Sequence, residues 1–160
     1  MDKATRLIQT LTAMEKTLVT AESCTGGLLG GVLTSVPGAS KVYLGGVISY
    51  AYSLKEELLD VDPQILANKG AICPEVAEQM AQGARKNLKA DYALALTGNA
   101  GPGTDPLNPN VGEIYVGLSA EEHTTTLRLD LTGNRAENRQ TACEKAIELL
   151  LAQLTMDNDS

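Results

Sequence analysis

The sequence predicts a single-domain α/β fold, a three-layer α/β/α sandwich around a mixed sheet. Stretches with apolar residues at helical spacing alternate with short strand-like runs through the first two thirds of the chain, an order typical of parallel β–α–β units. Two strand-like runs then follow one another with only four residues between them, which indicates an antiparallel pair toward one edge of the sheet. A chain of 160 residues without internal repeats or a low-complexity linker is long enough for one such core.

The elements of the first half follow from local patterns. Apolar residues at helical spacing predict a helix over 2–15, and the β-branched residues of TLVTA (17–21) predict a short buried strand. Small apolar residues over 25–35 predict a helix packed closely on the sheet, which the stretch SVPGAS ends. A second strand is expected over 41–50, where two adjacent glycines allow a bulge. A short helix is expected over 62–70, because an Asp-Pro pair provides its cap and first turn.

The second half continues the alternation and then changes to a hairpin. A helix is expected over 74–88 and a strand over 91–97, followed by a long loop rich in Gly, Pro and Asn. The expected hairpin joins strands over 112–119 and 124–131, and the last helix is expected from about 135 to 154. In sheets of this kind ligands bind at the carboxyl ends of the strands, so the polar strand exits ESCTGG and TGNAGPG are where we expect chemistry.

One domain is expected over residues 1–155, with residues 156–160 as a frayed tail. The amino-terminal MDKATRLIQTL carries charges of both signs at helical spacing, which is not typical of a signal peptide. No apolar run approaches the ~20 residues that cross a bilayer. Three cysteines without paired spacing favour reduced thiols, and we therefore expect a cytoplasmic protein.

The charge balance restricts the class of partner. A net charge of −7 argues against a broad surface for nucleic acid or an anionic membrane. Five tyrosines, with no Phe or Trp, leave few platforms on which single-stranded bases could stack. We expect a small-molecule substrate, and if it is an anion its positive partners must be local.

Imidazole chemistry is nearly excluded by composition. The only histidine, His123, falls at the tip of the expected hairpin beside two glutamates, where we expect it to be solvated. A Ser-His-Asp or Cys-His arrangement would need this residue, and zinc motifs built on paired histidines are excluded. The cysteines are not spaced as a metal site either.

The stretch TAESCTGG offers three candidate nucleophiles in a row, Ser23, Cys24 and Thr25, and a helix cap. Ser23 follows a strand, where it could cap a helix, or attack a carbonyl whose oxyanion the N–H groups of Cys24, Thr25 and Gly26 would hold. Cys24 is the rival nucleophile, but without a histidine its thiolate would depend on the helix terminus alone. We rank Ser23 first. Glu22 is either part of this site or a solvated turn carboxylate.

Lysine is the remaining common base. Lys55 follows the strand LGGVISY, five residues beyond Tyr50, at another strand exit. It could act as a base if burial or a nearby cation lowered its pKa. The alternative is that Lys55 begins a solvated helix, KEELL, and pairs with Glu56 or Glu57.

Two further segments could bind an anionic ligand. TGNAGPG (97–103) is either a plain loop or a main-chain surface that glycine allows to approach a ligand closely. Arg135 and Arg139 lie one turn apart at the start of the last helix, where cations oppose the helix dipole unless an anion is bound. The alternative is ion pairing with Glu137 or Asp130.

Together these motifs resemble a known family. TAESCTGG, SYAYSLK, GAICPEVAEQMAQG, ALALTGNAGP and TGNRAENR occur in the order found in the C-terminal domain of CinA-type competence/damage-inducible proteins, whose stand-alone members include nicotinamide-nucleotide amidases. The resemblance covers roughly residues 3–154, and TAESCTGG is highly specific for it. The sequence does not include the amino-terminal molybdopterin-binding-like domain of full-length CinA proteins.

The resemblance implies an activity and a site. The activity is hydrolysis of nicotinamide mononucleotide to nicotinate mononucleotide and ammonia, in pyridine-nucleotide recycling, by a serine–lysine mechanism with no metal or organic cofactor. Ser23 matches the nucleophilic serine, Tyr50 and Lys55 match the usual YSNxxK segment, 97–102 match the TGxAGP loop, and Arg135 matches the arginine of the usual GDR motif. The family also implies a homodimer or a higher homo-oligomer.

Three departures from the family pattern leave an alternative open. Ala51 and Tyr52 replace a serine and an asparagine, Cys73 stands where a serine is usual, and Asn134 replaces an aspartate. The lost donors could shift the substrate preference toward another small amide or weaken the placement of the lysine. The alternative function is a non-catalytic, pyridine-nucleotide-binding regulatory module.

The expected roles are as follows. Ser23 attacks the carboxamide carbon, Lys55 takes its proton, and Tyr50 relays or orients that proton. The residues expected to contact the substrate are Glu22, Cys24, Thr25, Gly26, Gly46, Thr97, Gly98, Ala100, Gly101, Arg135 and Arg139.

Overall fold

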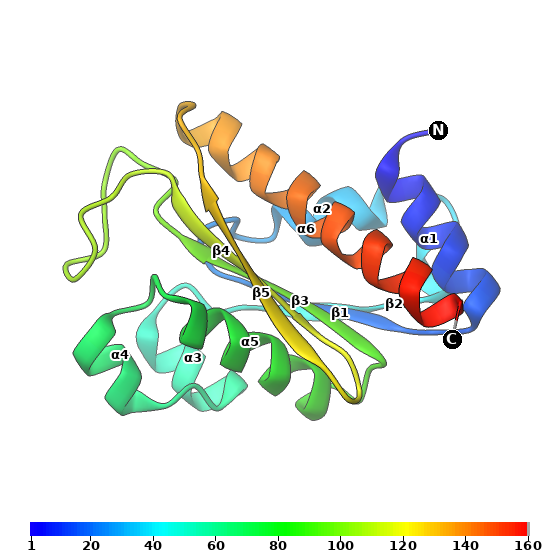
Figure 1. The fold of residues 1–160 in the computed structure, drawn as a ribbon, viewed down its shortest axis with the longest axis horizontal. Coiled ribbons are helices and arrows are strands. Elements are labelled where there is room, and N and C mark those ends of the chain that lie inside the picture. Colours follow the sequence, from blue (N-terminus) through cyan, green and yellow to red (C-terminus); the bar gives the residue numbers. More distant parts are fainter. Residues whose placement is uncertain (160) are drawn as a thin grey trace.

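A computed structural model describes residues 1–159 and shows one five-stranded sheet with helices on both faces (Figure 1). The elements, in chain order, are α1 (Lys3–Met14), β1 (Leu18–Glu22), α2 (Leu28–Thr34), the 3₁₀ helix η1 (Ala39–Lys41), β2 (Tyr43–Ile48), α3 (Tyr52–Leu59), α4 (Pro63–Lys69), α5 (Pro74–Asn87), β3 (Tyr92–Gly98), β4 (Glu113–Ser119), β5 (Thr124–Asp130) and α6 (Arg135–Asn158). The expected three-layer α/β/α architecture is confirmed.

The sheet is mixed, as predicted. Its strand order is β2-β1-β3-β4-β5, with β1 parallel to both of its neighbours and the last two strands antiparallel. Between Tyr43 and Gly45 the register of β2 against β1 shifts by one residue, so the bulge falls at the glycine pair or just before it. The carboxyl ends of the three parallel strands are in register, with Glu22 opposite Ile48 on one side and Leu96 on the other.

Alternation along the strands divides the interior between two cores. In β1, Leu18 contributes to the core under α1, α2 and α6, whereas Val19 and Ala21 contribute to the core under α3, α4 and α5. In β3, leucines face the first core and alanines face the second. Figure 1 shows these two groups of helices on opposite sides of the sheet.

Two glycines bring α5 close to its neighbours. A Cβ atom on Gly83 would lie 1.9 Å from the carbonyl oxygen of Leu59, the last residue of α3. A Cβ atom on Gly117 in β4 would lie 2.2 Å from the carbonyl oxygen of Ala77 in α5. Because no side chain fits at either position, α3 and the sheet are both held against the backbone of α5.

The structure differs from the sequence prediction at three helices. The segment 52–59 is a full helix, α3, which was considered only as the solvated alternative for Lys55. Helix α2 begins at Leu28 and not at residue 25, because the preceding residues form a turn. Helix α6 continues to Asn158, where the phenol of Tyr92 donates a hydrogen bond to Asp157, so part of the expected tail is helical; Ser160 lies outside the described residues.

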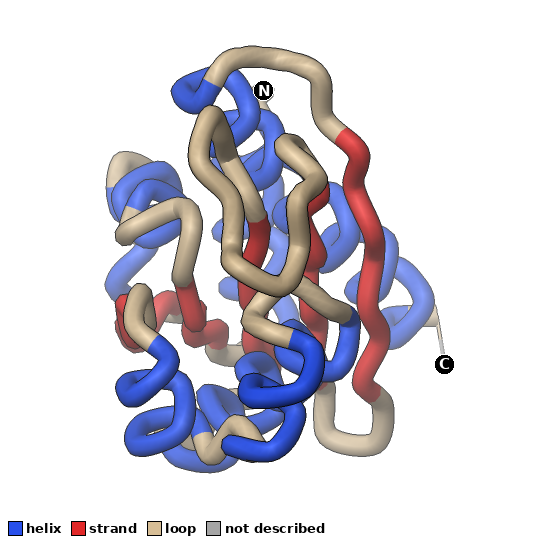
Figure 2. The backbone as a smooth tube through the Cα atoms, turned by 90° about the vertical axis from the view of Figure 1, so that its left-hand side faces the viewer, coloured by secondary structure: helices blue, strands red, loops and turns tan. Residues whose placement is uncertain are grey.

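The loop between β3 and β4 lies beside the strand exits. Figure 2 views the molecule from the side on which the parallel strands end, and the loop is in front of them.

Within residues 1–159, no helix has the length and apolar character that a bilayer span requires. The single histidine is exposed in the β4–β5 connection.

Candidate active site

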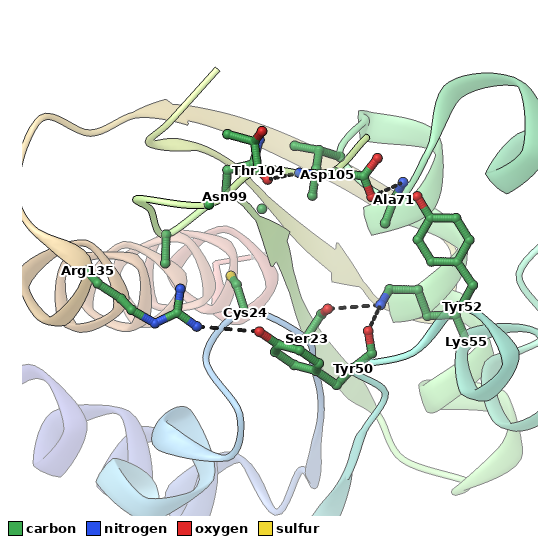
Figure 3. Close-up of a pocket in the computed structure, with 14 residues that line it drawn as sticks. Ser23, Cys24, Tyr50, Tyr52, Lys55, Ala71, Asn99, Thr104, Asp105 and Arg135 are labelled. Carbon is green, nitrogen blue, oxygen red and sulfur yellow. Dashed lines mark hydrogen bonds between the residues drawn. The ribbon is translucent and has the colours of Figure 1, made fainter. Parts of the chain in front are cut away.

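Ser23 and Lys55 meet at the carboxyl edge of the sheet. The Nζ atom of Lys55, in α3, lies 2.8 Å from the Oγ atom of Ser23, directly after β1 (Figure 3). Lys55 is 1% exposed and Ser23 is 8% exposed. The solvated-helix alternative for Lys55 is therefore wrong: it lies on a helix, but on its buried side.

Main-chain carbonyl groups orient the amine. Nζ of Lys55 donates hydrogen bonds to the carbonyl oxygen atoms of Ser49, at 2.6 Å, and Tyr50, at 3.2 Å. Burial lowers the pKa of Lys55 from 10.5 to about 8, although Cys24 and Asp105 oppose this shift. When the amine is neutral it keeps two N–H donors, which these carbonyl groups accept, and its lone pair is then directed at the Ser23 hydroxyl. The arrangement is that of a general base beside a nucleophile.

The turn after β1 does not use Ser23 as a helix cap. The N-cap of α2 is Gly27, with φ of 103°, which has no side chain to cap the helix, and the free N–H groups of the first turn bond to the carboxylate of Glu22 instead. The N–H of Gly26 donates to the carbonyl oxygen of Ser23 at 3.0 Å, so it closes the turn and does not face a ligand. The N–H groups of Cys24 and Thr25 remain the candidates for holding an oxyanion.

Cys24 lies next to Ser23 but is a different kind of group. Burial raises the pKa of its thiol to about 12, so it is protonated at neutral pH and cannot supply a thiolate. Its side chain lines the same cavity as Ser23. Thr25 is fully buried, and its hydroxyl has no hydrogen-bond partner among residues 1–159.

Arg139 binds the main chain of the turn that follows β1. Its Nε donates to the carbonyl oxygen of Cys24 at 3.1 Å, and its Nη2 donates to that of Thr25 at 2.8 Å. The expectation that Arg139 contacts the substrate is corrected: the guanidinium is committed to these carbonyl groups. The alternative pairing with Glu137 or Asp130 does not form either.

Glu22 and Gly46 were also expected to contact the substrate, but both hold parts of the fold together and do not face the cavity. The buried carboxylate of Glu22 accepts hydrogen bonds from the N–H groups of Leu29, at 2.8 Å, and Gly30, at 3.0 Å, and so anchors the first turn of α2. A Cβ atom on Gly46 would lie 2.2 Å from Oγ1 of Thr20 in the neighbouring strand. Neither residue lines the cavity at Ser23.

The TGNAGPG loop forms one wall. Thr97 is buried and donates its hydroxyl to the carbonyl oxygen of Ala71 at 2.8 Å, so it anchors the loop. Gly98 and Ala100 line the cavity. Gly101, with φ of 89°, accepts a hydrogen bond on its carbonyl oxygen from Arg135 at 3.0 Å.

Arg135 and Tyr50 lie at the mouth of the cavity. Nη2 of Arg135 is 3.4 Å from the hydroxyl oxygen of Tyr50, a residue that is 63% exposed (Figure 3). The contact of Tyr50 with Lys55 is made by its main-chain carbonyl group. The phenol has Arg135 as its hydrogen-bond partner, so the part of Tyr50 that orients Lys55 is its carbonyl group, and a proton relay through the phenol stays a prediction.

The cavity in front of Ser23 has a volume of about 310 Å³, near the lower end of the range for small-molecule sites. Its lining includes polar residues that sequence reasoning did not select, namely Tyr52, Asn99, Thr104 and Asp105. Tyr52 had a detectable signal, because it precedes Lys55 by three residues and shares its helix face. Among residues 1–159, no group of three or more His, Cys, Asp or Glu side chains is arranged to hold a metal ion.

Comparison with known proteins gives consistent matches. Residues 1–154 match the family described as the CinA C-terminal domain. A CinA-like protein of Desulfotalea psychrophila is 39% identical over 149 residues, which are 93% of this chain and 36% of that protein. A CinA-like protein of Frankia casuarinae is 44% identical over 138 residues, 86% of this chain and 32% of that protein. The chain thus spans about a third of the length of these curated relatives.

Solved structures agree with these matches. The competence/damage inducible protein CihA from Agrobacterium tumefaciens has a TM-score of 0.91 at 34% identity, with 96% of this chain and 93% of that chain covered. A competence-damaged protein (CinA) superfamily protein from Escherichia coli has a TM-score of 0.90 at 30% identity, with 93% and 87% covered.

Proposed function

The chain belongs to the CinA C-terminal domain family, and we propose that it is an amidohydrolase that acts on the carboxamide of nicotinamide mononucleotide. The observation that carries the proposal is the buried hydrogen bond of 2.8 Å between Lys55 Nζ and Ser23 Oγ. This contact lies at a cavity of small-molecule size, with a guanidinium at its mouth. One cavity thus holds a nucleophile, Ser23, a base, Lys55, and a cation suited to a phosphate, Arg135.

In the acylation step, Oγ of Ser23 bonds to the carboxamide carbon while the neutral amine of Lys55 takes the hydroxyl proton. The carbonyl oxygen becomes an oxyanion, for which the N–H groups of Cys24 and Thr25 are the candidate donors. The Lys55 ammonium then returns the proton to the departing –NH₂ group, the C–N bond breaks, and ammonia leaves an ester on Ser23.

Deacylation uses the same pair in reverse. Water enters where ammonia left, and neutral Lys55 accepts a proton from it as its oxygen bonds to the ester carbon. Collapse of the second tetrahedral intermediate breaks the bond to Ser23 Oγ, which recovers its proton from the Lys55 ammonium. The product is the carboxylate, nicotinate mononucleotide, so the balance is one amide plus one water to one acid plus one ammonia.

The cavity offers features suited to such a substrate. Arg135 has five N–H donors and matches the geometry of a phosphate, and it lies at the open end of the cavity. The rings of Tyr50 and Tyr52, which also line the cavity, provide apolar faces for an aromatic base. With the amide at Ser23, the phosphate would lie toward Arg135.

The test is release of ammonia from nicotinamide mononucleotide by the purified chain. Ser23→Ala and Lys55→Met should each lower kcat by at least about a thousandfold, because each removes a group that takes part in every turnover. Ser35→Ala and Lys86→Met are matched controls at exposed positions and should retain full activity. Wild-type activity in either site variant contradicts the mechanism. Tight binding of the mononucleotide with no ammonia release by the wild-type chain would favour the regulatory-module alternative.

A further inference from the structure

Helix α3 holds Lys55 but lacks a capping side chain. Its N-cap residue is Ala51, which makes no side-chain hydrogen bond to the first turn. Lys55 lies just beyond that turn, and its amine must reach Ser23 within hydrogen-bond distance. Some other contact has to hold the start of this helix in place.

Tyr52 makes that contact. It is the first residue of α3 and lies one turn before Lys55, so both side chains extend from the same face of the helix. Its hydroxyl donates a hydrogen bond to Oδ2 of Asp105, in the loop between β3 and β4. Burial, followed by the neighbouring Asp105, raises the pKa of Tyr52 to about 12, so the phenol keeps its proton and remains the donor.

Asp105 joins this helix to two other segments. Its Oδ1 accepts from the N–H of Leu107 at 3.0 Å, and its Oδ2 also accepts from the N–H of Ala71 at 3.4 Å. Its own N–H donates to Oδ1 of Asn99 at 2.9 Å. The carboxylate is therefore a junction between α3, the segment before α5 and the loop that walls the cavity.

Asn99 gives the junction a rigid base. Its side chain is 4% exposed, and its Nδ2 donates to the carbonyl oxygen atoms of Asn108, at 3.0 Å, and Asn110, at 3.1 Å. Asn108 in turn donates to the carbonyl oxygen of Ile72 at 3.3 Å. Through these bonds the position of Asp105 is set by the whole loop.

We propose that Tyr52 and Asp105 form a latch that positions Lys55 against Ser23, and that both are positioning residues of the site. The proposal rests on the proposed amidohydrolase function for its kinetic consequences, but the placement of Lys55 can be tested without turnover. The latch acts in two ways. The hydrogen bond fixes the first turn of α3, and the carboxylate supplies a negative charge on the same cavity as the amine.

The charges around Lys55 make the second effect measurable. The titratable groups whose negative form would favour its ammonium are Cys24, in the turn after β1, and Asp105, in the loop. Cys24 is an uncharged thiol at neutral pH, which leaves Asp105 as the negative charge. Arg135 and the phenols of Tyr50 and Tyr52 line the same cavity. Loss of the Asp105 charge should therefore lower the pKa of Lys55 further.

The first experiment follows the titration of Lys55 by ¹³C NMR of isotope-labelled lysine, with Lys55→Met used to assign its signal. Asp105→Asn keeps one oxygen that can accept from Tyr52 and Ala71, replaces the acceptor of the Leu107 N–H with an amide NH2 group and removes the charge. It should shift the titration midpoint to lower pH. Glu121→Gln, which removes one negative charge from the exposed hairpin, should leave the midpoint unchanged. An unchanged midpoint in Asp105→Asn overturns the latch, whether or not the chain hydrolyses any amide.

The second experiment separates positioning from substrate contact. Tyr52→Phe keeps the ring but removes the hydroxyl, and kcat should fall by roughly tenfold or more with little change in KM, because the amine is less well placed. In Asp105→Asn the rise of activity with pH should move to lower pH along with the titration. A raised KM with unchanged kcat in Tyr52→Phe would make Tyr52 a substrate contact and overturn its positioning role. If Asp105→Asn lowers the Lys55 titration midpoint but the wild-type chain releases no ammonia, the proposed function is refuted and the latch is not.

Discussion

At the scale of single residues, burial determines which group beside the cavity can react. The same loss of solvent disfavours the charged form of every group, so it lowers the pKa of Lys55 to about 8 and raises that of Cys24 to about 12. The lysine becomes an available base near neutral pH, whereas the cysteine becomes an inert thiol. Serine at position 23 needs the base next to it, and the structure provides it at 2.8 Å.

Arg135 carries the residue-scale prediction. If its guanidinium binds the 5′-phosphate, Arg135→Ala should raise KM for nicotinamide mononucleotide by roughly 10- to 100-fold, the range expected for a charged hydrogen bond. KM for the riboside, which lacks the phosphate, should change little. Steady-state ammonia assays on both substrates provide the comparison. Equal effects on the two substrates would remove the phosphate role and leave Arg135 as a support for Gly101.

Some residue roles could be predicted from the sequence and others could not. The residues alone rank Ser23 first and make Lys55 a candidate base, because each follows a strand and the single histidine is badly placed for catalysis, and the family resemblance joins the two as a serine–lysine pair. Glu22 and Arg139 are expected at the ligand because they lie close in sequence to Ser23 and to Arg135, but their side chains bind the backbone of α2 and of the turn after β1 and do not line the cavity. Sequence spacing predicts which segments of backbone lie at a site, but it does not predict whether each side chain points into the site or away from it.

At the scale of elements, α3 was the hardest helix to predict. Its sequence, YSLKEELL, places a lysine on the buried face, so the apolar periodicity that marks a helix is interrupted at the functional residue. The contact between Tyr52 and Asp105 joins segments 53 residues apart, so no local sequence pattern predicts it. The catalytic position of this helix depends on its packing against α5.

That packing gives the element-scale prediction. Gly83→Ala would place a Cβ atom 1.9 Å from the carbonyl oxygen of Leu59, so α3 and α5 must separate. We expect a loss of about 1–3 kcal/mol in the free energy of unfolding, as for other overpacked cores, and a fall in kcat because Lys55 moves with α3. The matched control is Gly31→Ala in α2, which meets no atom within 4 Å and should be neutral or stabilising by up to about 1 kcal/mol. Urea unfolding and ammonia release measure both; equal stability of the two variants would contradict this account of the packing.

At the scale of the whole molecule, the topology explains why distant motifs share one site. Parallel strands deliver their carboxyl ends to one edge, so the segments after β1, β2 and β3 meet although they are separated in sequence. This much could be predicted, because it follows from the alternation of helices and strands. The wall formed by the β3–β4 loop could not, because its shape depends on the buried side chain of Asn99 and its long-range partners.

The free energy of unfolding should depend on pH in a way that reflects the buried Lys55. The pKa of Lys55 is about 8 in the folded chain against its usual 10.5, so in this pH window the unfolded state binds more protons than the folded state. The contribution of Lys55 to the free energy of unfolding therefore rises as the pH increases from about 8 to 10.5. Below about pH 8 the folded state holds a buried ammonium, which costs about 3 kcal/mol. Lys55→Met removes the titration. The difference in free energy of unfolding, wild type minus Lys55→Met, should increase in favour of the wild type by about 2–3 kcal/mol between pH 7 and pH 10, as measured by urea unfolding. Because both proteins share every other titrating group, a constant difference would mean that Lys55 titrates like an exposed lysine and is a poor base near neutral pH.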